Sequence, residues 1–481
     1  MIETDRKSLG AWYTPTTIVS MVVDAVVDPT WVAARSGAIR VVDPACGDGR
    51  FLRAAIDRLR DAGAVVVEAV GVDVDPAAAS AAREMVPEAT VVVADALGDV
   101  WTAFGRLGRD DARSPRAGEL DGFDLVVGNP PYLSQMATST ARGGASRHGG
   151  GPYADVAVEF LALGARLVDR AGGRLGFVLP QSLLSTRDAA EVRRSIDERA
   201  TMLWSSWTGE RDFDAQVVTC ALAFEFGRTE PDPRPWSSVV TARLGVPPVP
   251  TVLAGGTTAG VLGDRAWLNA NFRDEYYGMI PAVGDHEHGP PLVTSGLIDP
   301  GRCRWGDRPV RFAKRDFAAP RLDLAALDPR MRAWATRRLR PKVLVANQTK
   351  VLEAVADPTG DWLPGVPVVA VYPEAGHAPS AVGDGVWEIA AVLTSASASA
   401  WAWHERGGTG LSATAIRVGP VMLGELPWPG EPLDDAVAAL RSGDVLACGR
   451  AVDRAFGVGD DEARSLADWW EPTVSELTSR M

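Results

Sequence analysis

Long apolar runs, cysteine pairs and metal-ligand patterns are all missing from this sequence of 481 residues. No run of about 18 apolar residues occurs, so we expect no membrane-spanning helix. The polar segment 1–10 predicts no signal peptide. The cysteines are far apart and lack the spacing of a zinc site, which predicts free thiols, no bound metal and a cytoplasmic protein: Cys46, Cys220, Cys303 and Cys448.

The chain also lacks an excess of positive charge, because its formal net charge is −13. This balance argues against a protein that coats nucleic acid over its whole surface, but it allows a local basic patch. With 46% hydrophobic and 23% charged residues, the chain has the composition of a globular protein. Its length predicts two or three domains.

What is present is an alternation of short β-branched runs with helix-like segments between residues 39 and 226. This alternation predicts a parallel, doubly wound α/β sheet, in which ligands bind beyond the carboxyl ends of the strands. The expected strands are Ile39–Asp43, Val65–Asp73, Thr90–Asp95, Phe123–Asn129, Arg174–Pro180 and Val217–Phe226. The expected helices are Arg50–Ala62, Pro76–Met85, Val156–Arg170 and Ala189–Arg199.

Changes in composition divide the chain further. We expect a first domain over residues 1–230 and a proline-rich linker over residues 231–250. Residues 251–430, rich in tryptophan, proline and short β-like runs, are expected to form a second domain. Residues 431–481 predict a helical appendage.

Acidic and glycine-rich signals follow the first three strands. Asp43 is followed by Pro-Ala-Cys-Gly-Asp-Gly and a helix, an arrangement that holds a nucleotide-like ligand without being a phosphate loop or a dinucleotide fingerprint. Asp73 ends the second strand, where an acid can accept ribose hydroxyls, and Asp95 ends the third, where it can accept an exocyclic amine. Each aspartate alone is more often a turn or cap residue, but three at successive strand ends favour a binding site.

The fourth strand ends in Asn129-Pro130-Pro131-Tyr132. Two prolines after a buried strand make the backbone rigid. The Asn129 side-chain oxygen and the Pro130 carbonyl then offer two acceptors to an amino group. Taken alone, the tetrapeptide is also compatible with a simple rigid turn.

Together with Gly10-Ala11-Trp12-Tyr13-Thr14-Pro15 upstream, these motifs resemble the gamma-class adenine-N6 DNA methyltransferases that have a C-terminal target recognition domain. The resemblance spans residues 8 to about 226. It implies a Rossmann-like class I S-adenosylmethionine-dependent methyltransferase domain followed by a mixed α+β recognition domain. The implied function is methyl transfer from S-adenosylmethionine to N6 of a flipped adenine, in a restriction–modification or related defence system. The alternatives are an RNA or protein-glutamine methyltransferase, or a DNA-binding subunit without activity.

The resemblance also implies roles for individual residues. The target adenine would contact Asn129, Pro130, Tyr132 and Phe213, the last as a stacking wall. The cofactor would contact Thr14, Pro15, Asp43, Ala45, Cys46, Gly47, Asp73, Val74, Asp95, Ala96, Asn129, Pro131 and Phe160, although plain helix core explains Phe160 equally well.

A local basic patch does occur, since residues 301–350 hold 14 lysines and arginines against four acids. A solvated charged face is the alternative to a contact surface for double-stranded DNA. The expected contacts are Arg302, Arg304, Arg311, Lys314, Arg315, Arg338, Lys342 and Lys350. Because no segment resembles a nuclease core, we expect any cleavage to require a separate restriction or defence subunit.

Overall fold

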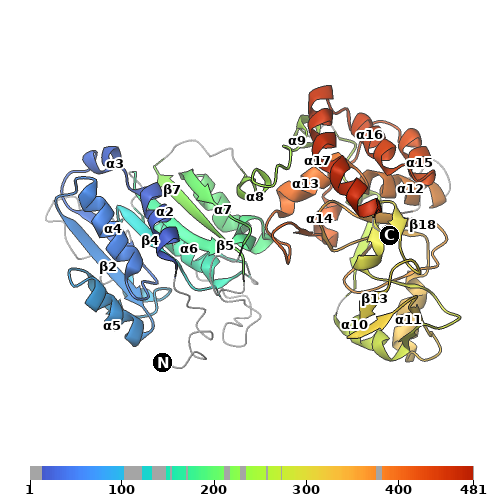
Figure 1. Ribbon diagram of the computed structural model, residues 1–481, viewed down its shortest axis with the longest axis horizontal. Helices are drawn as coiled ribbons and strands as arrows, with labels where there is room; N and C mark the ends of the chain where they lie inside the picture. The colour runs from blue at the N-terminus through green and yellow to red at the C-terminus, as the bar shows by residue number, and fades with distance from the viewer. Residues whose placement is uncertain are drawn as a thin grey trace. The chain divides into compact units, whose positions relative to one another are not determined.

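The computed structural model describes residues 14–101, 122–132, 148–151, 154–168, 172–210, 217–227, 235–255, 258–271, 273–374 and 382–479. The chain forms two compact units, Met1–Val239 and Val240–Met481 (Figure 1). The boundary lies inside residues 231–250, the range in which the linker is expected.

Unit 1 is built on one seven-stranded sheet with the order β3-β2-β1-β4-β5-β7-β6. Neighbouring strands from β3 to β5 are parallel, whereas β7 runs antiparallel to both β5 and β6. This topology is that of the class I methyltransferase fold, so the expected α/β class is confirmed. The strands are β1 (Ile39–Asp43), β2 (Val67–Asp73), β3 (Thr90–Val93), β4 (Leu125–Gly128), β5 (Arg174–Pro180), β6 (Ala200–Ser206) and β7 (Thr219–Phe226).

Helices cover both faces of this sheet. On β5, a side chain at Gly176 would touch Val22 and Val26 of α2, whereas Gly164 of α6 packs close to Leu175 and Phe177. Because neighbouring strand residues face opposite sides, α2 and α6 lie on opposite faces. The helices of unit 1 are α2 (Thr16–Val26), α3 (Pro29–Ala33), α4 (Arg50–Asp61), α5 (Pro76–Met85), α6 (Val156–Leu167) and α7 (Ala190–Asp197), with 3-10 turns at Gln181–Leu184 and Arg187–Ala189; α8 (Ser238–Thr241) lies at the boundary with unit 2.

Besides the short helix α3, two elements of unit 1 were not expected from the sequence. One is α2, which packs against β5 and β7 through its buried valines. The other is the edge strand β6, whose mixture of buried and exposed residues gives no regular alternation and which has a bulge between Met202 and Trp204. Expected strands also begin too early, as at Val65, which is 95% exposed and precedes β2.

Unit 2 combines a four-stranded antiparallel sheet with short strand pairs and helices. The sheet has the order β18-β16-β20-β8, and α12 packs against its first three strands. Its strands are β8 (Ala266–Ala270), β16 (Lys342–Val345), β18 (Ala354–Asp357) and β20 (Val369–Pro373). The short strands pair as β9 (Val283–Gly284) with β15 (Arg321–Leu322), β10 (Leu292–Val293) with β19 (Leu363–Pro364), β11 (Ile298–Asp299) with β12 (Arg302–Cys303), β13 (Val310–Phe312) with β14 (Arg315–Phe317), and β17 (Gln348–Thr349) with β21 (Ile416–Arg417).

The C-terminal helices pack within unit 2 instead of standing apart from it. Helix α15 contacts α12 and α16, and α17 contacts α13 and α16 (Figure 1). The helices of unit 2 are α9 (Thr251–Ala254), α10 (Arg273–Met279), α11 (Pro329–Arg338), α12 (Val382–Leu393), α13 (Ala396–Arg406), α14 (Pro420–Gly424), α15 (Asp434–Arg441), α16 (Val445–Phe456) and α17 (Asp460–Ser479), with 3-10 turns at Leu262–Asp264, Ile280–Ala282 and Ser295–Leu297. Among the residues described, no helix combines the length and apolarity needed to cross a membrane.

Candidate active site

The carboxyl ends of β1, β2, β3 and β4 meet at one edge of the sheet. In the strand register Asp43 pairs with Gly71, and Asp73 pairs with Val93. Val42 pairs with Val126, two residues before the end of β4. The motifs that follow these strands therefore gather at the same edge, as expected for ligand binding in a parallel sheet.

Asp43 lies beneath this edge and is only 1% exposed. Its Oδ1 accepts a hydrogen bond from the backbone N–H of Ala45 at 3.0 Å. Burial raises the pKa of the Asp43 carboxyl to about 8. Gly128 comes so close that a Cβ there would lie 2.6 Å from Asp43 Oδ1, and its φ of +155° also disfavours a side chain. The end of β4 is thus packed directly against the acid that ends β1.

Asp73 connects β2 to the glycine-rich turn after β1. Its Oδ2 accepts from the backbone N–H of Gly47 at 2.8 Å, and its Oδ1 accepts from the N–H of Asp75 at 2.9 Å. Burial is the largest cause of a raised pKa at Asp73. The next residue, Val74, is 59% exposed and offers an apolar surface beside the carboxyl group.

Asp95 and Ala96 follow β3 with opposite exposure. Asp95 is exposed, and its Oδ1 accepts from the N–H of Leu97 at 2.9 Å. Ala96 is buried, and its carbonyl accepts a hydrogen bond from Trp101 Nε1 at 2.6 Å. One carboxylate oxygen of Asp95 therefore stabilises a turn, as expected for a turn residue. The second oxygen can accept a hydrogen bond from a further donor.

Asn129 is held by two partners at the end of β4. Its Nδ2 donates to Thr14 Oγ1 at 2.8 Å, and its Oδ1 accepts from the hydroxyl of Tyr132. Burial raises the pKa of Tyr132 well above the usual value, so the phenol is protonated and acts as donor. Pro130 is buried and Pro131 is partly buried between them. The tetrapeptide thus folds back on itself and is tied to the N-terminal segment.

Arg50 completes this connection and was missed in the sequence analysis. Its guanidinium pairs with Asp48 through Nε–Oδ1 at 2.9 Å and Nη2–Oδ2 at 2.6 Å. Its Nη1 also donates to the backbone carbonyl of Thr14. The sequence signal was the charged pair Asp48-Gly49-Arg50 inside a glycine-rich turn, where charges must find local partners.

Four further site predictions have different outcomes. Phe213 lies outside the described residues. Phe160 is 6% exposed within α6, which agrees with a core residue and leaves its proposed cofactor contact a prediction. Burial raises the pKa of Cys46, so its thiol stays protonated and is no nucleophile. Pro15 precedes α2 as its N-cap residue.

Glu159 is a second residue that the sequence analysis did not single out. It is 4% exposed on α6 and accepts backbone hydrogen bonds from His148 at 2.9 Å and Gly150 at 3.1 Å. A buried carboxylate with two backbone donors fixes the position of this glycine-rich segment.

Two expected DNA contacts are wrong. Arg304 is 5% exposed and pairs with Asp299 at 2.6 Å. Lys342 is fully buried and pairs with Asp357. Both charges are neutralised inside unit 2 and are unavailable to a phosphate. The sequence analysis did not anticipate these ion pairs, because the acidic partners lie five and 15 residues away from the two basic residues.

The other expected DNA contacts differ in solvent exposure and in whether they form ion pairs. Arg302 is exposed but pairs with Asp307 at 2.8 Å. Arg338 is partly buried. Four cations are exposed and take part in no ion pair among the residues that the structure describes: Arg311, Lys314, Arg315 and Lys350. Three of these lie on the β13–β14 hairpin, whose Phe312 and Phe317 are buried.

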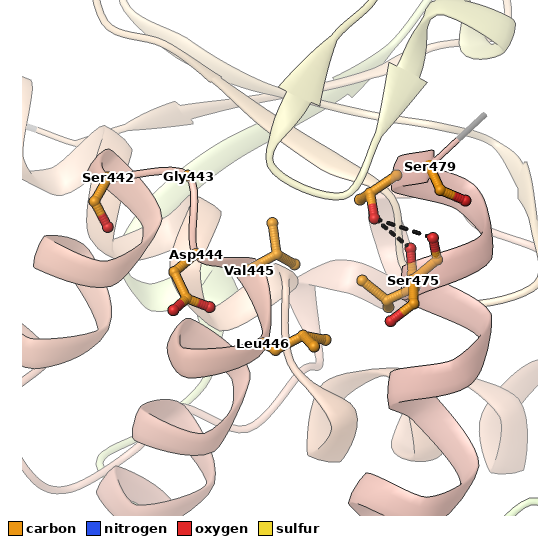
Figure 2. Close-up of a pocket in the computed structure, with 9 residues that line it drawn as sticks. Ser442, Gly443, Asp444, Val445, Leu446, Ser475 and Ser479 are labelled. Atoms are coloured by element: carbon orange, nitrogen blue, oxygen red, sulfur yellow. Dashed lines mark hydrogen bonds between the residues drawn. The ribbon is translucent and has the colours of Figure 1, made fainter. Parts of the chain in front are cut away.

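A hollow of about 520 Å³ in unit 2 lies between the start of α16 and the end of α17 (Figure 2). Several of its polar groups have internal partners. Asp444 accepts from Ala447 N–H at 2.9 Å, and the Thr478 hydroxyl donates to Val474 O at 2.8 Å. We therefore assign it no chemistry. Within the described ranges there is also no cluster of histidine, cysteine and acidic residues placed to hold a metal, His286 and His288 included.

Comparisons with known proteins agree with the motifs at the sheet edge. Residues 1–202 match the family described as N-6 DNA Methylase. The Type II methyltransferase M.XamI of Xanthomonas campestris pv. amaranthicola is 33% identical over 124 residues, which are 26% of this chain and 20% of that protein. The Type II methyltransferase M.TthHB8I of Thermus thermophilus is 31% identical over 206 residues, 39% of this chain and 38% of that protein.

Among solved structures, the M protein of the Type I restriction enzyme EcoKI is 18% identical, with 48% of this chain and 47% of that chain covered and a TM-score of 0.34. A TM-score of 0.34 carries no argument about the fold, which we assign from the strand order of the sheet. The chain spans between a fifth and two fifths of the length of the curated relatives. The match to the N-6 DNA Methylase family, residues 1–202, covers strands β1 to β5 of the class I sheet and ends within β6.

Proposed function

We propose that the chain transfers the methyl group of S-adenosylmethionine to the N6 amine of an adenine at a specific site in double-stranded DNA. The observation that best supports this proposal is the position of the Asn129 amide. It is held between Thr14 and Tyr132, at the edge of the sheet where Asp43 and Asp73 also lie. The family match over residues 1–202 supports the same reaction.

The residues at this edge fit the methyl donor by their chemistry. Asp73 has lone pairs left for ribose hydroxyls after accepting two backbone hydrogen bonds, and Val74 offers an exposed apolar surface to the purine. Asp95 and the backbone of Ala96 would hold the adenine of the donor. The Asp43 carboxyl would lie on the methionine side, together with the turn at Ala45, Cys46 and Gly47. Once bound, the donor supplies a methyl group activated by a sulfonium.

Asn129 would act as acceptor for the target amine. Its Oδ1, which accepts from the Tyr132 hydroxyl, would also accept a hydrogen bond from an N6 hydrogen of the adenine. The Pro130 carbonyl would accept the other hydrogen. Two such bonds favour a tetrahedral nitrogen whose lone pair is free to attack, so the protein contributes positioning and electrostatics and needs no general base.

The target adenine must leave the duplex to reach this edge, at a cost of a few kcal/mol. Stacking on aromatic side chains returns about 1–3 kcal/mol per base. We assign this role to Tyr132, which would also hold Asn129, and to Phe213. Unit 2 would recognise the DNA through exposed cations, among them Arg311, Lys314 and Arg315.

The biological setting is part of the proposal. Two relatives are named Type II methyltransferases, and this supports a role in restriction–modification or a related defence system. The chain would then work on cytoplasmic DNA beside a separate restriction or defence subunit.

A methyl-transfer assay tests the proposal. Labelled S-adenosylmethionine is incubated with the protein and either duplex DNA, RNA or a protein extract, and the DNA is digested to nucleosides for mass spectrometry. We expect N6-methyladenine from DNA alone. Label in RNA or in glutamine would support the alternative enzymes, and no label in any substrate would support a subunit without activity.

The Asn129→Ala variant tests the assigned chemistry. It should retain S-adenosylmethionine binding in calorimetry, yet lose methyl transfer by a factor on the order of 100 or more, as when an active-site hydrogen-bonding group is removed. Tyr132→Phe keeps the ring and removes the hydroxyl, so it should retain base stacking and lose part of the rate. Full activity in Asn129→Ala would refute the role of Asn129.

A further inference from the structure

Unit 2 has an arginine–aromatic cluster that includes residues outside the expected DNA contacts. Trp267 of β8 and Tyr372 of β20 pair across the sheet, with ring centroids 5.1 Å apart and planes inclined by 30°. The Arg340 guanidinium lies 4.3 Å from the Tyr372 ring centroid and 5.5 Å from that of Trp267. Trp267 is 45% exposed and Arg340 is exposed, so both face solvent.

A second guanidinium lies next to the first. Arg338 is 4.6 Å above the Trp334 ring, and its Nε and Nη2 donate to Asn271 Oδ1 at 3.1 Å and Asn269 Oδ1 at 3.2 Å. Burial raises the pKa of Tyr372 to about 12, and the nearby positive charges of Arg338 and Arg340 both offset part of this rise. The two cations therefore belong to one cluster and are held in fixed orientations by rings and amides.

The positive charge of this cluster is not neutralised by acids. Neither Arg338 nor Arg340 forms an ion pair with a carboxylate that the structure describes. Burial lowers the pKa of Arg338, and the negative charge of Glu275 offsets only part of this effect. Arg337 adds a third cation, and the C-terminal end of α11 offsets only part of the charge. In a chain with net charge −13, this is an uncompensated positive site.

The backbone beneath Arg340 is held by the buried ion pair of Lys342 and Asp357. Lys342 Nζ also donates to the Arg340 carbonyl at 3.2 Å. Asp357 accepts from the N–H of Gly360 at 2.9 Å and so closes a loop against Arg340. At Gly360 the φ is +79°, and a Cβ would lie 2.4 Å from the Arg340 carbonyl carbon. Burying Lys342 thus orders the neighbouring exposed arginine.

We propose that Trp267, Arg338 and Arg340 form a preorganised binding site for the phosphodiester backbone of duplex DNA. The Arg340 guanidinium, stacked on aromatic rings, keeps its N–H edge for the oxygens of a phosphate. Arg338, whose Nε and Nη2 donate to the two asparagines, adds positive charge beside it. The exposed indole beside it packs against a deoxyribose or a base. The site reads no sequence and fixes the duplex on unit 2. It deepens the proposed function, because it takes duplex DNA as the substrate.

The test is the salt dependence of DNA binding by the full-length chain. Fluorescence anisotropy with a labelled duplex of mixed sequence gives the slope of log K against log salt. Arg340→Ala should weaken binding on the order of tenfold and lower the slope by about one unit, which is the loss of one phosphate contact. Trp267→Ala should weaken binding without changing the slope, since it removes no charge.

Arg441→Ala is the matched control. Arg441 is exposed and lies 5.4 Å from the Trp387 ring centroid, but it pairs with Asp384 at 2.7 Å. Its removal takes away the same formal charge from unit 2 and should leave affinity and slope unchanged. Arg340→Lys, which keeps the charge but not the planar fork, should retain most of the slope and lose part of the affinity.

The outcomes separate this inference from the proposed function. Wild-type slope and affinity in Arg340→Ala, with methyl transfer to DNA intact in the wild type, would overturn the inference alone. Equal effects of Arg340→Ala and Arg441→Ala would also overturn it, because they indicate a general charge effect. Duplex binding that depends on Arg340, with no methyl transfer to adenine by the wild type, would overturn the proposed function alone.

Discussion

Asn129 donates a hydrogen bond to the hydroxyl of Thr14, 2.8 Å away, across 115 residues of chain. The residue that we assign to amine recognition is therefore oriented by the segment that precedes the first helix. Tyr132 holds the other end of the same amide, so both of its polar atoms are engaged before a base arrives.

Removing this hydroxyl should slow methyl transfer. In Thr14→Ala the Asn129 amide loses one orienting partner, and we expect the single-turnover rate to fall about tenfold, the scale of one hydrogen bond of about 1.4 kcal/mol. Thr14→Ser keeps the hydroxyl and should restore most of the rate. Equal rates in Thr14→Ala and wild type would show that Thr14 does not position the amide.

Arg50→Ala should weaken binding of S-adenosylmethionine. The substitution removes the ion pair with Asp48 in the glycine-rich turn and the hydrogen bond to the backbone carbonyl of Thr14. We expect a higher Kd in calorimetry, with a smaller change in the rate at saturating donor. Arg53→Ala, one turn along α4 and paired with Asp57 and Glu88 on the surface, is the control and should bind like the wild type. A normal Kd in Arg50→Ala would contradict the linking role.

The buried Asp43 carboxyl should make the stability of unit 1 depend on pH. Its folded-state pKa of about 8 lies above its usual value of 3.8, so ionisation destabilises the folded state. The contribution is fully present below about pH 4 and is lost as pH rises towards 8. Asp43→Asn stays neutral, so its Tm relative to wild type should increase from pH 5 to pH 9. Parallel Tm curves would argue against a raised pKa.

Gly128→Ala should destabilise the sheet edge. The new Cβ would lie 2.6 Å from Asp43 Oδ1, and relieving such an overlap typically costs about 1–3 kcal/mol. Urea denaturation measures the loss. Gly245→Ala is the control, because Gly245 has a φ of +65° but open space around it, and should show only the smaller cost of backbone strain. Similar losses at both glycines would contradict a steric cause at Gly128.

Lys342→Met should destabilise unit 2 by about 3–5 kcal/mol, since it leaves the Asp357 carboxylate buried and unpaired. The double variant Lys342→Met with Asp357→Leu removes both charges and should recover part of that loss in urea denaturation. A single variant as stable as the wild type would mean that the ion pair contributes little to the fold.

Much of unit 1 follows from local patterns. The motifs at Asp43, Asp73 and Asn129 are short and contiguous, and each follows a run of β-branched residues, so strand, turn and site could be inferred together. The expected doubly wound sheet agrees with the observed strand order. Helix α2 and strand β6 were not predicted, because each is stabilised by contacts with distant strands: α2 packs on β5 and β7, and β6 pairs with β7.

The basic stretch of unit 2 shows where sequence reasoning ends. Charge counting identifies the region but cannot distinguish Arg340, which is exposed, from Lys342, which is fully buried beside Asp357. Trp267 joins the cluster only through strand pairing with Tyr372, 105 residues later. Local residue order thus specifies which chemistry follows each strand, because turns and strand ends involve near neighbours. Which charges reach solvent is set by contacts between distant segments, because burial and pairing depend on partners that no local pattern names.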